Sequence, residues 1–447
     1  MSDLYISRLE CIQDAMQVHL DRLEKYFPER KVAIVAFHNV LECFIGKSPG
    51  ASTHTINPKD IENFEQGMDA ARTITNRQNP WKMVGENIDE FRKHVRNLST
   101  KGSTALGPAL AVALGLARQH KQEYAAATEI FLCTDGASNT GIGSIQHQYI
   151  ETSLHGRSFY SQAGEIALNQ SAKINIIGLA GEDVALDVLA VASQVSGGVV
   201  TTVQPDELRR EIRSVSQRRG IASDVTVKLH MPNQWHFVSD PRPGVAISAN
   251  TLTYTLPQVN DETSVGFAFA ITDKSASKAG VLTDTIPFQA HITYTSTTTG
   301  NTNVRVLNKV IPVTTDRECA ENAAHVALTG TYYLQKIAFQ MNQVLIKNLS
   351  FGKEGTRQLS TLRDTLYASH QLLIRAAKTT IAQEELANFS HESNQLDREL
   401  ELVSSIRVGP AKDRAVKIFS RTALLSSNSL MSGSKKIAQV NRRNMIR

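Results

Sequence analysis

Residues 129–143 read EIFLCTDGASNTGIG, a short apolar run followed at once by polar, turn-forming residues. The run Glu129–Cys133 has the length and composition of a buried strand. Asp135 and Gly136 follow it closely, and glycine lets the chain turn sharply. Ligands collect beyond the carboxyl ends of parallel strands. Asp135 is therefore either a functional loop residue or the first residue of a common Asp-Gly turn.

Strands and helices are expected to alternate around this stretch throughout residues 1–219. Short apolar runs of strand length are separated by segments whose apolar residues recur at helical spacing. The expected strands are residues 31–37, 129–133, 174–180 and 199–203, and the expected helices are residues 6–23, 105–119, 160–172 and 184–194. Such alternation predicts a mainly parallel sheet with helices on both faces, which is an α/β domain with a Rossmann-like arrangement.

Three further regions follow. Residues 220–315 alternate apolar and polar side chains with a period of two, which predicts an antiparallel β-sandwich. Residues 316–407 show helical periodicity and predict a helical region, opened by Thr315 and Glu318 at capping-box spacing. Residues 408–447 form a basic, Ser-rich tail, which is typical of a solvating segment. The chain is therefore expected to be multidomain.

Composition excludes several classes of protein. The net charge of +5 over 447 residues is mild and its charges are interspersed, so nothing indicates nucleic-acid binding. No apolar run is long enough to span a bilayer. The four cysteines are scattered without a CxxC pair, which favours a reducing, intracellular compartment, and we expect a cytoplasmic protein.

A second loop carries hydroxyl groups to the start of a helix. The stretch KGSTALGPAL, residues 101–110, places Ser103 and Thr104 just before the expected helix. A hydroxyl oxygen at such a position can cap the helix or ligate a metal ion. For a single threonine, capping is the more common role.

Together, the loops at Thr104 and Asp135 resemble those of the von Willebrand factor A family. Residues 8–40 are also similar to the family's first helix and second strand. The resemblance covers residues 1–219 and implies a metal-ion-dependent adhesion site, in which Mg²⁺ is held by loop oxygens and binds an acidic side chain of a protein partner. It implies that Thr104 and Asp135 are metal ligands and that Ser103 and Gly136 shape the partner-binding loops.

The chain departs from this family at its first residues. The family's first strand ends in D-x-S-x-S, which supplies an aspartate and two serines, whereas this chain begins MSDLYISRLE and enters its first helix at once. We therefore expect that the first strand lies upstream of this sequence, and that a central strand of the sheet is missing. Two ligand oxygens are too few for a cation that takes about six. Binding of Mg²⁺ is expected to be weak or absent in this chain.

Enzyme motifs do not fit the residues. The stretch FIGKS, residues 44–48, lacks the first glycine of a phosphate-binding loop because position 41 is Leu41, and it is expected to be a hairpin loop. A phosphatase-type D-x-D-G loop would need aspartate where Cys133 stands. No histidine has metal-ligand spacing, and His38 is expected to be structural. The chain is not expected to be an enzyme.

The order of the regions is also similar to that of COPII inner coat proteins, with a trunk, a β-sandwich and a helical module. Residues 304–330 resemble the sandwich-to-helix passage of that group. The α/β loops resemble those of A-domain proteins that carry a circularly permuted Ras-like domain. Three functions therefore remain open: a protein-binding adhesion-type module, a coat or trafficking scaffold without a metal, and the effector part of a GTPase polypeptide. The sequence does not identify the partner or the oligomeric state.

Overall fold

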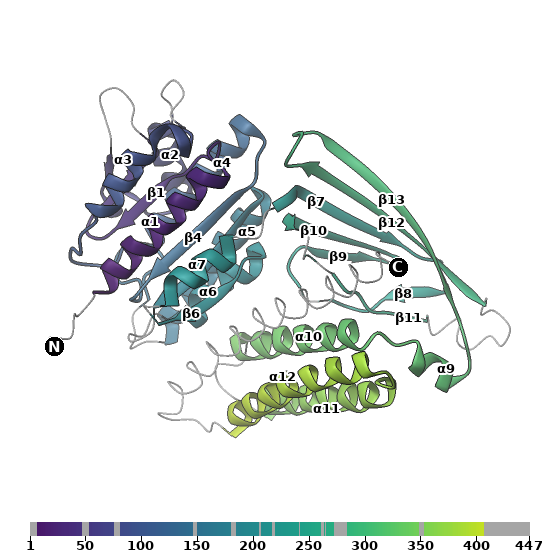
Figure 1. Cartoon of the computed structure of the whole chain (residues 1–447). Coiled ribbons are helices and arrows are strands. Elements are labelled where there is room, and N and C mark those ends of the chain that lie inside the picture. The colour runs from purple at the N-terminus through teal and green to yellow at the C-terminus, as the bar shows by residue number, and fades with distance from the viewer. Residues whose placement is uncertain are drawn as a thin grey trace. The chain divides into compact units, whose positions relative to one another are not determined.

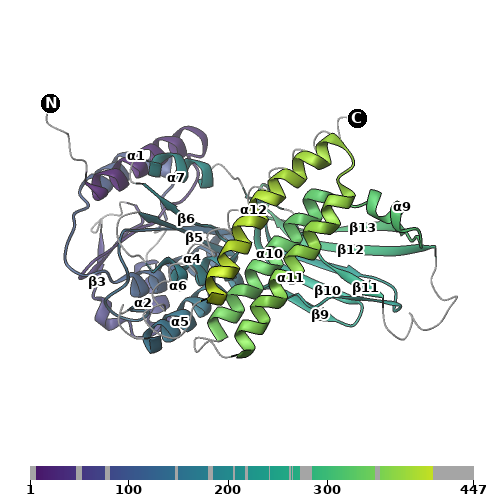
Figure 2. The ribbon, with the colours of Figure 1, turned by 90° about the horizontal axis from the view of Figure 1, so that it is seen from below.

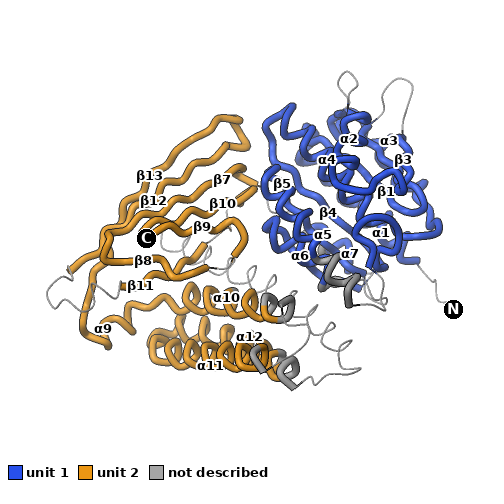
Figure 3. The backbone as a smooth tube through the Cα atoms, turned by 180° about the vertical axis from the view of Figure 1, so that it is seen from behind, with its two compact units in different colours: residues 1–219 blue, residues 220–447 orange. Residues whose placement is uncertain are grey.

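The quoted stretch forms a parallel strand in the computed structural model of the chain (Figure 1). The structure describes residues 7–46, 53–75, 81–145, 150–179, 185–204, 207–216, 220–240, 242–260, 263, 265–271, 284–347 and 353–405. The chain divides into two units, Met1–Arg219 and Gly220–Arg447 (Figure 3). Each unit has its own sheets and helices.

The first unit contains a parallel sheet of the expected kind. Strand β4 (Thr128–Thr134) pairs in parallel with β5 (Ala172–Leu179), and β5 pairs in parallel with β6 (Val200–Val203). Side chains of β5 are buried almost throughout because helices cover both faces. The predicted α/β class is confirmed.

A separate antiparallel sheet completes the strands of this unit. Strand β1 (Ile34–Phe37) pairs with β2 (Leu41–Phe44), which pairs with β3 (His54–Ile56). The stretch FIGKS begins at Phe44, the last residue of β2, and its Lys47 and Ser48 lie outside the described residues, so the expected hairpin loop stays a prediction. Within the described ranges, no pairing joins β1 to β4. The side chains of β4 are only half-buried at most positions, and the expectation of a missing central strand stays a prediction.

Helix α1 (Arg8–Tyr26) packs against both sheets of the unit. It begins with a capping box in which the Ser7 hydroxyl accepts the Glu10 amide and the Glu10 carboxylate accepts the Ser7 amide. Its first half shares an apolar cluster with the parallel sheet, and its second half shares one with the antiparallel sheet. The clusters include Ala15, Ile177, Leu179 and Val203 in the first, and Leu20, Leu23, Ile34 and Phe44 in the second.

The remaining helices of this unit include several that the sequence pattern did not indicate. They are α2 (Phe64–Thr75), α3 (Val84–Arg96), α4 (Leu106–Tyr124), α5 (Ile150–Asn169), α6 (Leu186–Ser196), α7 (Leu208–Ser216) and a 3-10 turn at Pro58–Asp60. Helices α4, α5 and α6 match the expected segments with shifted ends, whereas α2, α3 and α7 were not predicted. Gly67 of α2 packs directly on Ala111 of α4, so these helices approach closely.

The second unit begins with the predicted antiparallel strands. They are β7 (Gly220–His230), β8 (Trp235–Phe237), β9 (Val245–Ser248), β10 (Thr251–Asn260), β11 (Phe269–Ile271), β12 (Thr285–Ser296) and β13 (Thr302–Pro312). Five strands form one sheet in the order β13-β12-β7-β10-β9, and β8 pairs with β11. Phe237 of the smaller sheet packs with Leu252 of the larger one, so an apolar core joins the two layers.

Helices close the second unit. They are α9 (Arg317–Asn322), α10 (Val326–Lys347), α11 (Lys353–Ala376) and α12 (Thr380–Ser405). Figure 2 shows α10, α11 and α12 side by side. Leu334, Ile337, Leu359, Leu373 and Leu400 belong to their shared apolar core, as the helical periodicity predicts.

The predicted capping box at Thr315 and Glu318 is wrong. Asp316 is the N-cap of α9, and its carboxylate accepts the backbone N–H of Glu318 at 2.9 Å. Asp316 stands one residue closer to the helix, so its short side chain reaches the second helical amide. The expected tail, residues 408–447, lies outside the described residues. No helix in the described ranges is long and apolar enough to cross a membrane.

Two largely buried histidines make the stability of the first unit dependent on pH. Burial, followed by the nearby positive charges, lowers the pKa of His19 and of His120 from 6.5 to about 4. The His19 ring lies tilted against Phe131, and His120 lies edge-on to Trp81. The unfolded chain takes up protons below pH 6.5, whereas the folded unit stays neutral at both histidines until about pH 4.

We expect the first unit to be most stable above pH 6.5 and to lose stability as the pH falls towards about 4. The loss should be about 3 kcal/mol for each histidine. Denaturant unfolding, monitored by amide exchange, measures the free energy of unfolding across this pH range. The variants His19→Leu and His120→Leu should each reduce the slope of this free energy against pH. An unchanged slope in both variants contradicts the assignment.

Candidate functional site

The loop after β4 and the loop before α4 meet at one end of the α/β unit. Asp135 follows the last residue of β4, and Thr104 stands two residues before the first residue of α4. A Cβ built on Gly136 would lie 4.0 Å from the Thr104 hydroxyl oxygen. The two loops that the sequence singled out are therefore neighbours, and the small Gly136 leaves space beside Thr104.

Asn139 holds these two loops together. Its side-chain Oδ1 accepts the backbone N–H of Thr104 at 2.7 Å and the hydroxyl of Thr140 at 3.1 Å. Its own backbone N–H donates to the Thr104 carbonyl at 3.1 Å. Reciprocal bonds of this kind fix the register of one loop against the other, so Thr104 has a defined position relative to Asp135.

Asn39, in the turn between β1 and β2, joins a third loop to the same end of the unit. Its Oδ1 accepts both the backbone N–H and the hydroxyl of Ser103, each at 2.8 Å. Gly102 has a φ of +63°, and a side chain there would collide with Asn39. Glycine at this position is thus required for both conformation and space. We call Asn39, Gly102–Thr104 and Asp135–Thr140 the rim loops.

Thr104 does not cap α4. Ala105 occupies the N-cap position, and it makes no side-chain capping bond. The capping alternative for Thr104 is therefore wrong. The cause is the length of the loop, which places Thr104 one residue before the position from which a hydroxyl reaches the first free amides.

Asp135 has a cationic neighbour that the sequence did not indicate. Its Oδ2 lies 3.7 Å from a terminal nitrogen of Arg8, at the start of α1. The Asp135 side chain is 54% exposed and that of Arg8 is 32% exposed. An ion pair with this much solvent contributes little stability, but it places a positive charge beside the carboxylate.

The residues present do not fit a complete magnesium site. Mg²⁺ requires near-octahedral oxygen coordination, and the site residues that the sequence indicated offer one carboxylate, from Asp135, and the hydroxyls of Ser103 and Thr104. The Ser103 hydroxyl already donates to Asn39. Among the described residues, no group of three histidine, cysteine or acidic side chains lies close enough to hold a metal. The guanidinium of Arg8 also repels a cation at Asp135.

The sequence revealed only part of this site. Thr104, Ser103, Asp135 and Gly136 were found because their loops flank a strand and a helix. Asn39, Asn139 and Arg8 were missed, since each acts through a partner distant in the chain. Asn139 lies within the stretch quoted first, and an amide side chain beside an Asp-Gly turn was the available signal.

Neighbouring nucleophiles do not support an enzyme. Burial raises the pKa of the Cys133 thiol to about 12, so the reactive thiolate does not form near neutral pH. His38 binds Glu42 at 3.1 Å and accepts the backbone N–H of Val40 at 3.2 Å. Both ring nitrogens of His38 therefore have local structural partners.

The chain has relatives in sequence and in fold, although no family model matches it. It is 27% identical over 363 residues to "Circularly permutated Ras protein 1" of Dictyostelium discoideum, which covers 81% of this chain and 41% of that protein. The human COPII-coat protein Sec24c has a TM-score of 0.62 at 13% identity, covering 94% of this chain and 57% of Sec24c. In fold, the chain is similar to a COPII-coat protein.

A weaker likeness is to the ArnB paralog VWA2 of Sulfolobus acidocaldarius, with a TM-score of 0.40 at 11% identity. The chain comprises an α/β unit with a parallel sheet, an antiparallel β-sandwich and a helical region, as predicted, and this fold is similar to that of Sec24c. The chain spans about two fifths of its curated relative and somewhat more than half of Sec24c.

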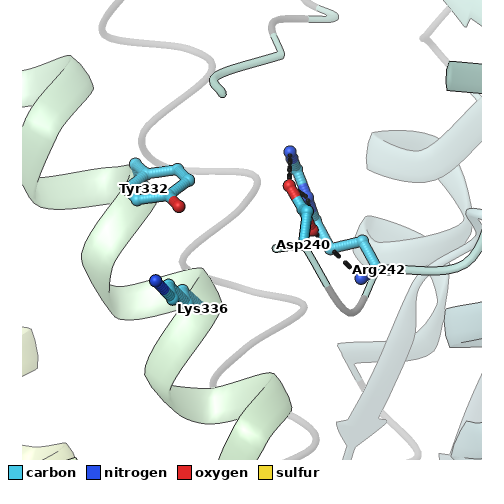
Figure 4. Close-up of a pocket in the computed structure, with 4 residues that line it drawn as sticks. All are labelled: Asp240, Arg242, Tyr332 and Lys336. Carbon is cyan, nitrogen blue, oxygen red and sulfur yellow. Dashed lines mark hydrogen bonds and ion pairs between the residues drawn. The ribbon is translucent and has the colours of Figure 1, made fainter. Parts of the chain in front are cut away.

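A pocket in the second unit of this COPII-like fold is a candidate for a different site. Figure 4 shows Asp240 and Arg242 on the segment after β8, facing Tyr332 and Lys336 of α10. The Arg242 guanidinium binds both Asp240 oxygens, at distances from 2.6 to 3.0 Å, and the Gly266 carbonyl at 2.6 Å. Because its partners lie within the fold, this arginine is structural.

We expect weak or undetectable Mg²⁺ binding by this chain in isothermal titration calorimetry. Arg8→Ala should strengthen any binding, because it removes the positive charge beside the carboxylate, and Asp135→Ala should abolish it. A dissociation constant in the low micromolar range for the unaltered chain contradicts this expectation.

Asp240→Ala is expected to destabilise the second unit by about 3–5 kcal/mol, because it leaves the Arg242 charge buried and unpaired. The Asp240 side chain is only 5% exposed, whereas Asp69, paired with Arg72, is 62% exposed. Asp69→Ala therefore serves as the control and should cost less than about 1 kcal/mol. Denaturant unfolding measures the loss of free energy of unfolding in each variant. Equal losses would show that the Asp240–Arg242 pair is not needed for the stability of the second unit.

Proposed function

We propose that this chain is a non-enzymatic, protein-binding scaffold whose partner contacts the rim loops. Two asparagines fix three loops, from different parts of the chain, into one surface at the end of the sheet. This is the observation that carries the proposal. Ordering exposed loops costs conformational entropy. A partner that binds loops already ordered in this way does not have to supply that entropy on binding.

Two basic residues beside the rim loops would suit a partner with an acidic side chain. Arg8 lies beside Asp135, and Lys101 lies 3.2 Å from Glu42 near the same loops. In an adhesion-type site, a bound Mg²⁺ would attract the partner's carboxylate. Here the Arg8 guanidinium lies beside Asp135, and we propose that a carboxylate of the partner pairs with this arginine through paired hydrogen bonds.

A second candidate function is that of a coat or trafficking scaffold without a metal requirement. The likeness to Sec24c extends over nearly the whole chain, including the sandwich and helices, whereas a binding site at the rim loops needs only the first unit. In this alternative, the α/β domain is a structural trunk and the partner uses other surfaces. Both candidates imply protein partners and a cytoplasmic location.

A third candidate rests on the similarity to circularly permutated Ras protein 1. The chain would then be the effector part of a longer polypeptide that also carries a Ras-like domain. Sequencing the transcript and mapping peptides of the protein from its natural source test this. A Ras-like domain in the same polypeptide supports it, and a polypeptide without one contradicts it.

Asp135→Ala and Thr104→Ala are expected to remove the partner that binds the rim loops. The immobilised full chain and each variant are compared for proteins captured from the same lysate, identified by mass spectrometry. Asp69→Ala is the matched control, because Asp69 is an exposed aspartate on α2 that pairs only locally with Arg72.

A partner that is lost with both rim variants and retained with Asp69→Ala supports the proposal. Retention of that partner after chelation of divalent cations distinguishes the Arg8 arrangement from a metal-dependent one. If the same proteins bind every variant, the rim loops are not the contact surface and the coat-type alternative is favoured.

A further inference from the structure

Strand β13 is a long edge strand with unusual exposure. It has 11 residues and pairs only with β12 in the described sheet, so one row of its backbone N–H and C=O groups faces away from the sheet. Figures 1 and 3 show it at the outer side of the second unit's large sheet. Natural proteins usually shorten or cover such edges, because they pair readily with other strands.

Both faces of β13 carry exposed aliphatic side chains. Val304, Val306 and Val310 are 65%, 49% and 57% exposed on one face, and Leu307 is 44% exposed on the other. The three valines stand opposite Thr293, His291 and Pro287 of β12. Their face is therefore the outer, mostly polar one, and a valine row there has no packing role in the core.

The same strand is basic. Arg305 and Lys309 alternate with the valines, and residues 302–312 contain no acidic side chain. Among the described residues, neither Arg305 nor Lys309 forms an ion pair. Both are exposed and stand opposite Ile292 and Phe288 of β12. One face of β13 thus presents two unneutralised positive charges, and the other presents three aliphatic groups.

These charges oppose pairing between two copies of β13. In the antiparallel register that pairs all 11 residues, Arg305 of one copy lies directly opposite Lys309 of the other. Like charges directly opposite each other destabilise a sheet. A strand with carboxylates at these positions has the reverse effect, since opposite charges across two strands attract.

The two longest segments of this chain outside the described ranges have the wrong composition for this role. Residues 406–447 are basic and contain one acidic side chain, Asp413, and residues 272–283 also contain only one, Asp273. Neither segment offers two carboxylates at alternate positions. Neither of these two segments therefore supplies the complementary strand.

We propose that β13 is a docking edge for a protein partner that adds an extended segment to the sheet, with carboxylates facing Arg305 and Lys309 and aliphatic side chains facing Val304 and Val306. Backbone hydrogen bonds supply affinity, and the alternating side chains supply specificity. This surface lies in a different unit from the rim loops and does not depend on the function proposed for them.

The test uses the full chain and two synthetic peptides of the same length as β13. One alternates valine with glutamate, and the other alternates valine with lysine. Fluorescence anisotropy is expected to show about tenfold tighter binding of the glutamate peptide, from two opposite-charge pairs. Amide exchange should slow in residues 302–312 when that peptide binds. N-methylation of alternate peptide nitrogens should abolish binding, because it removes the pairing edge.

The double variant Arg305→Glu/Lys309→Glu should reverse the preference and bind the lysine peptide. Lys93→Glu, an exposed lysine on α3, is the matched control and should leave the preference unchanged. Circular dichroism establishes that each variant is folded. Equal binding of both peptides, or unchanged binding of the N-methylated peptide, overturns the proposal. So does reversible self-association that is lost with Val306→Lys, because a second copy would then be the occupant.

Discussion

The packing of helix α1 across two separate sheets is the constraint on which the first unit depends. Within the described residues, β1 and β4 do not pair, so hydrogen bonds do not join the antiparallel hairpin to the parallel sheet. Apolar contacts from the two halves of α1 join them instead. Because burial of apolar surface is not directional, the helix also needs its Ser7–Glu10 capping box to fix where it begins. That start determines the position of Arg8.

The rim loops follow from this arrangement. The loop at the carboxyl end of β4 lies beside the loop before α4, because Asn139 is hydrogen-bonded to Thr104, and the carboxyl ends of parallel strands are where ligands bind in such sheets. Asparagine side chains then do what a shared metal ion does in adhesion-type sites, since they tie separate loops to one another. Arg8 adds a positive charge beside Asp135 at the same loops.

The second unit contains both a buried, paired arginine and exposed basic residues on a strand without acidic residues. Arg242 is enclosed, and its charge is neutralised by Asp240 beneath Tyr254 and Phe267. Arg305 and Lys309 are exposed on an edge strand without an acidic neighbour in that strand. In the first arrangement both partners are required, because removing one would leave a desolvated charge without its counter-ion. The second leaves charge available for recognition, where screening by solvent lowers its contribution to stability.

The sequence by itself determined the α/β class, the antiparallel sandwich, the helical region and the loops that carry Thr104 and Asp135, because each rests on local periodicity or on residues adjacent to a strand. It did not determine α2 or α3, and it misplaced the start of α9 by preferring Thr315 to Asp316. Only the tertiary structure revealed Asn39, Asn139 and Arg8 at the site and the exposure of β13. Those features depend on contacts between residues far apart in the chain, and a linear pattern carries no record of which distant segments become neighbours.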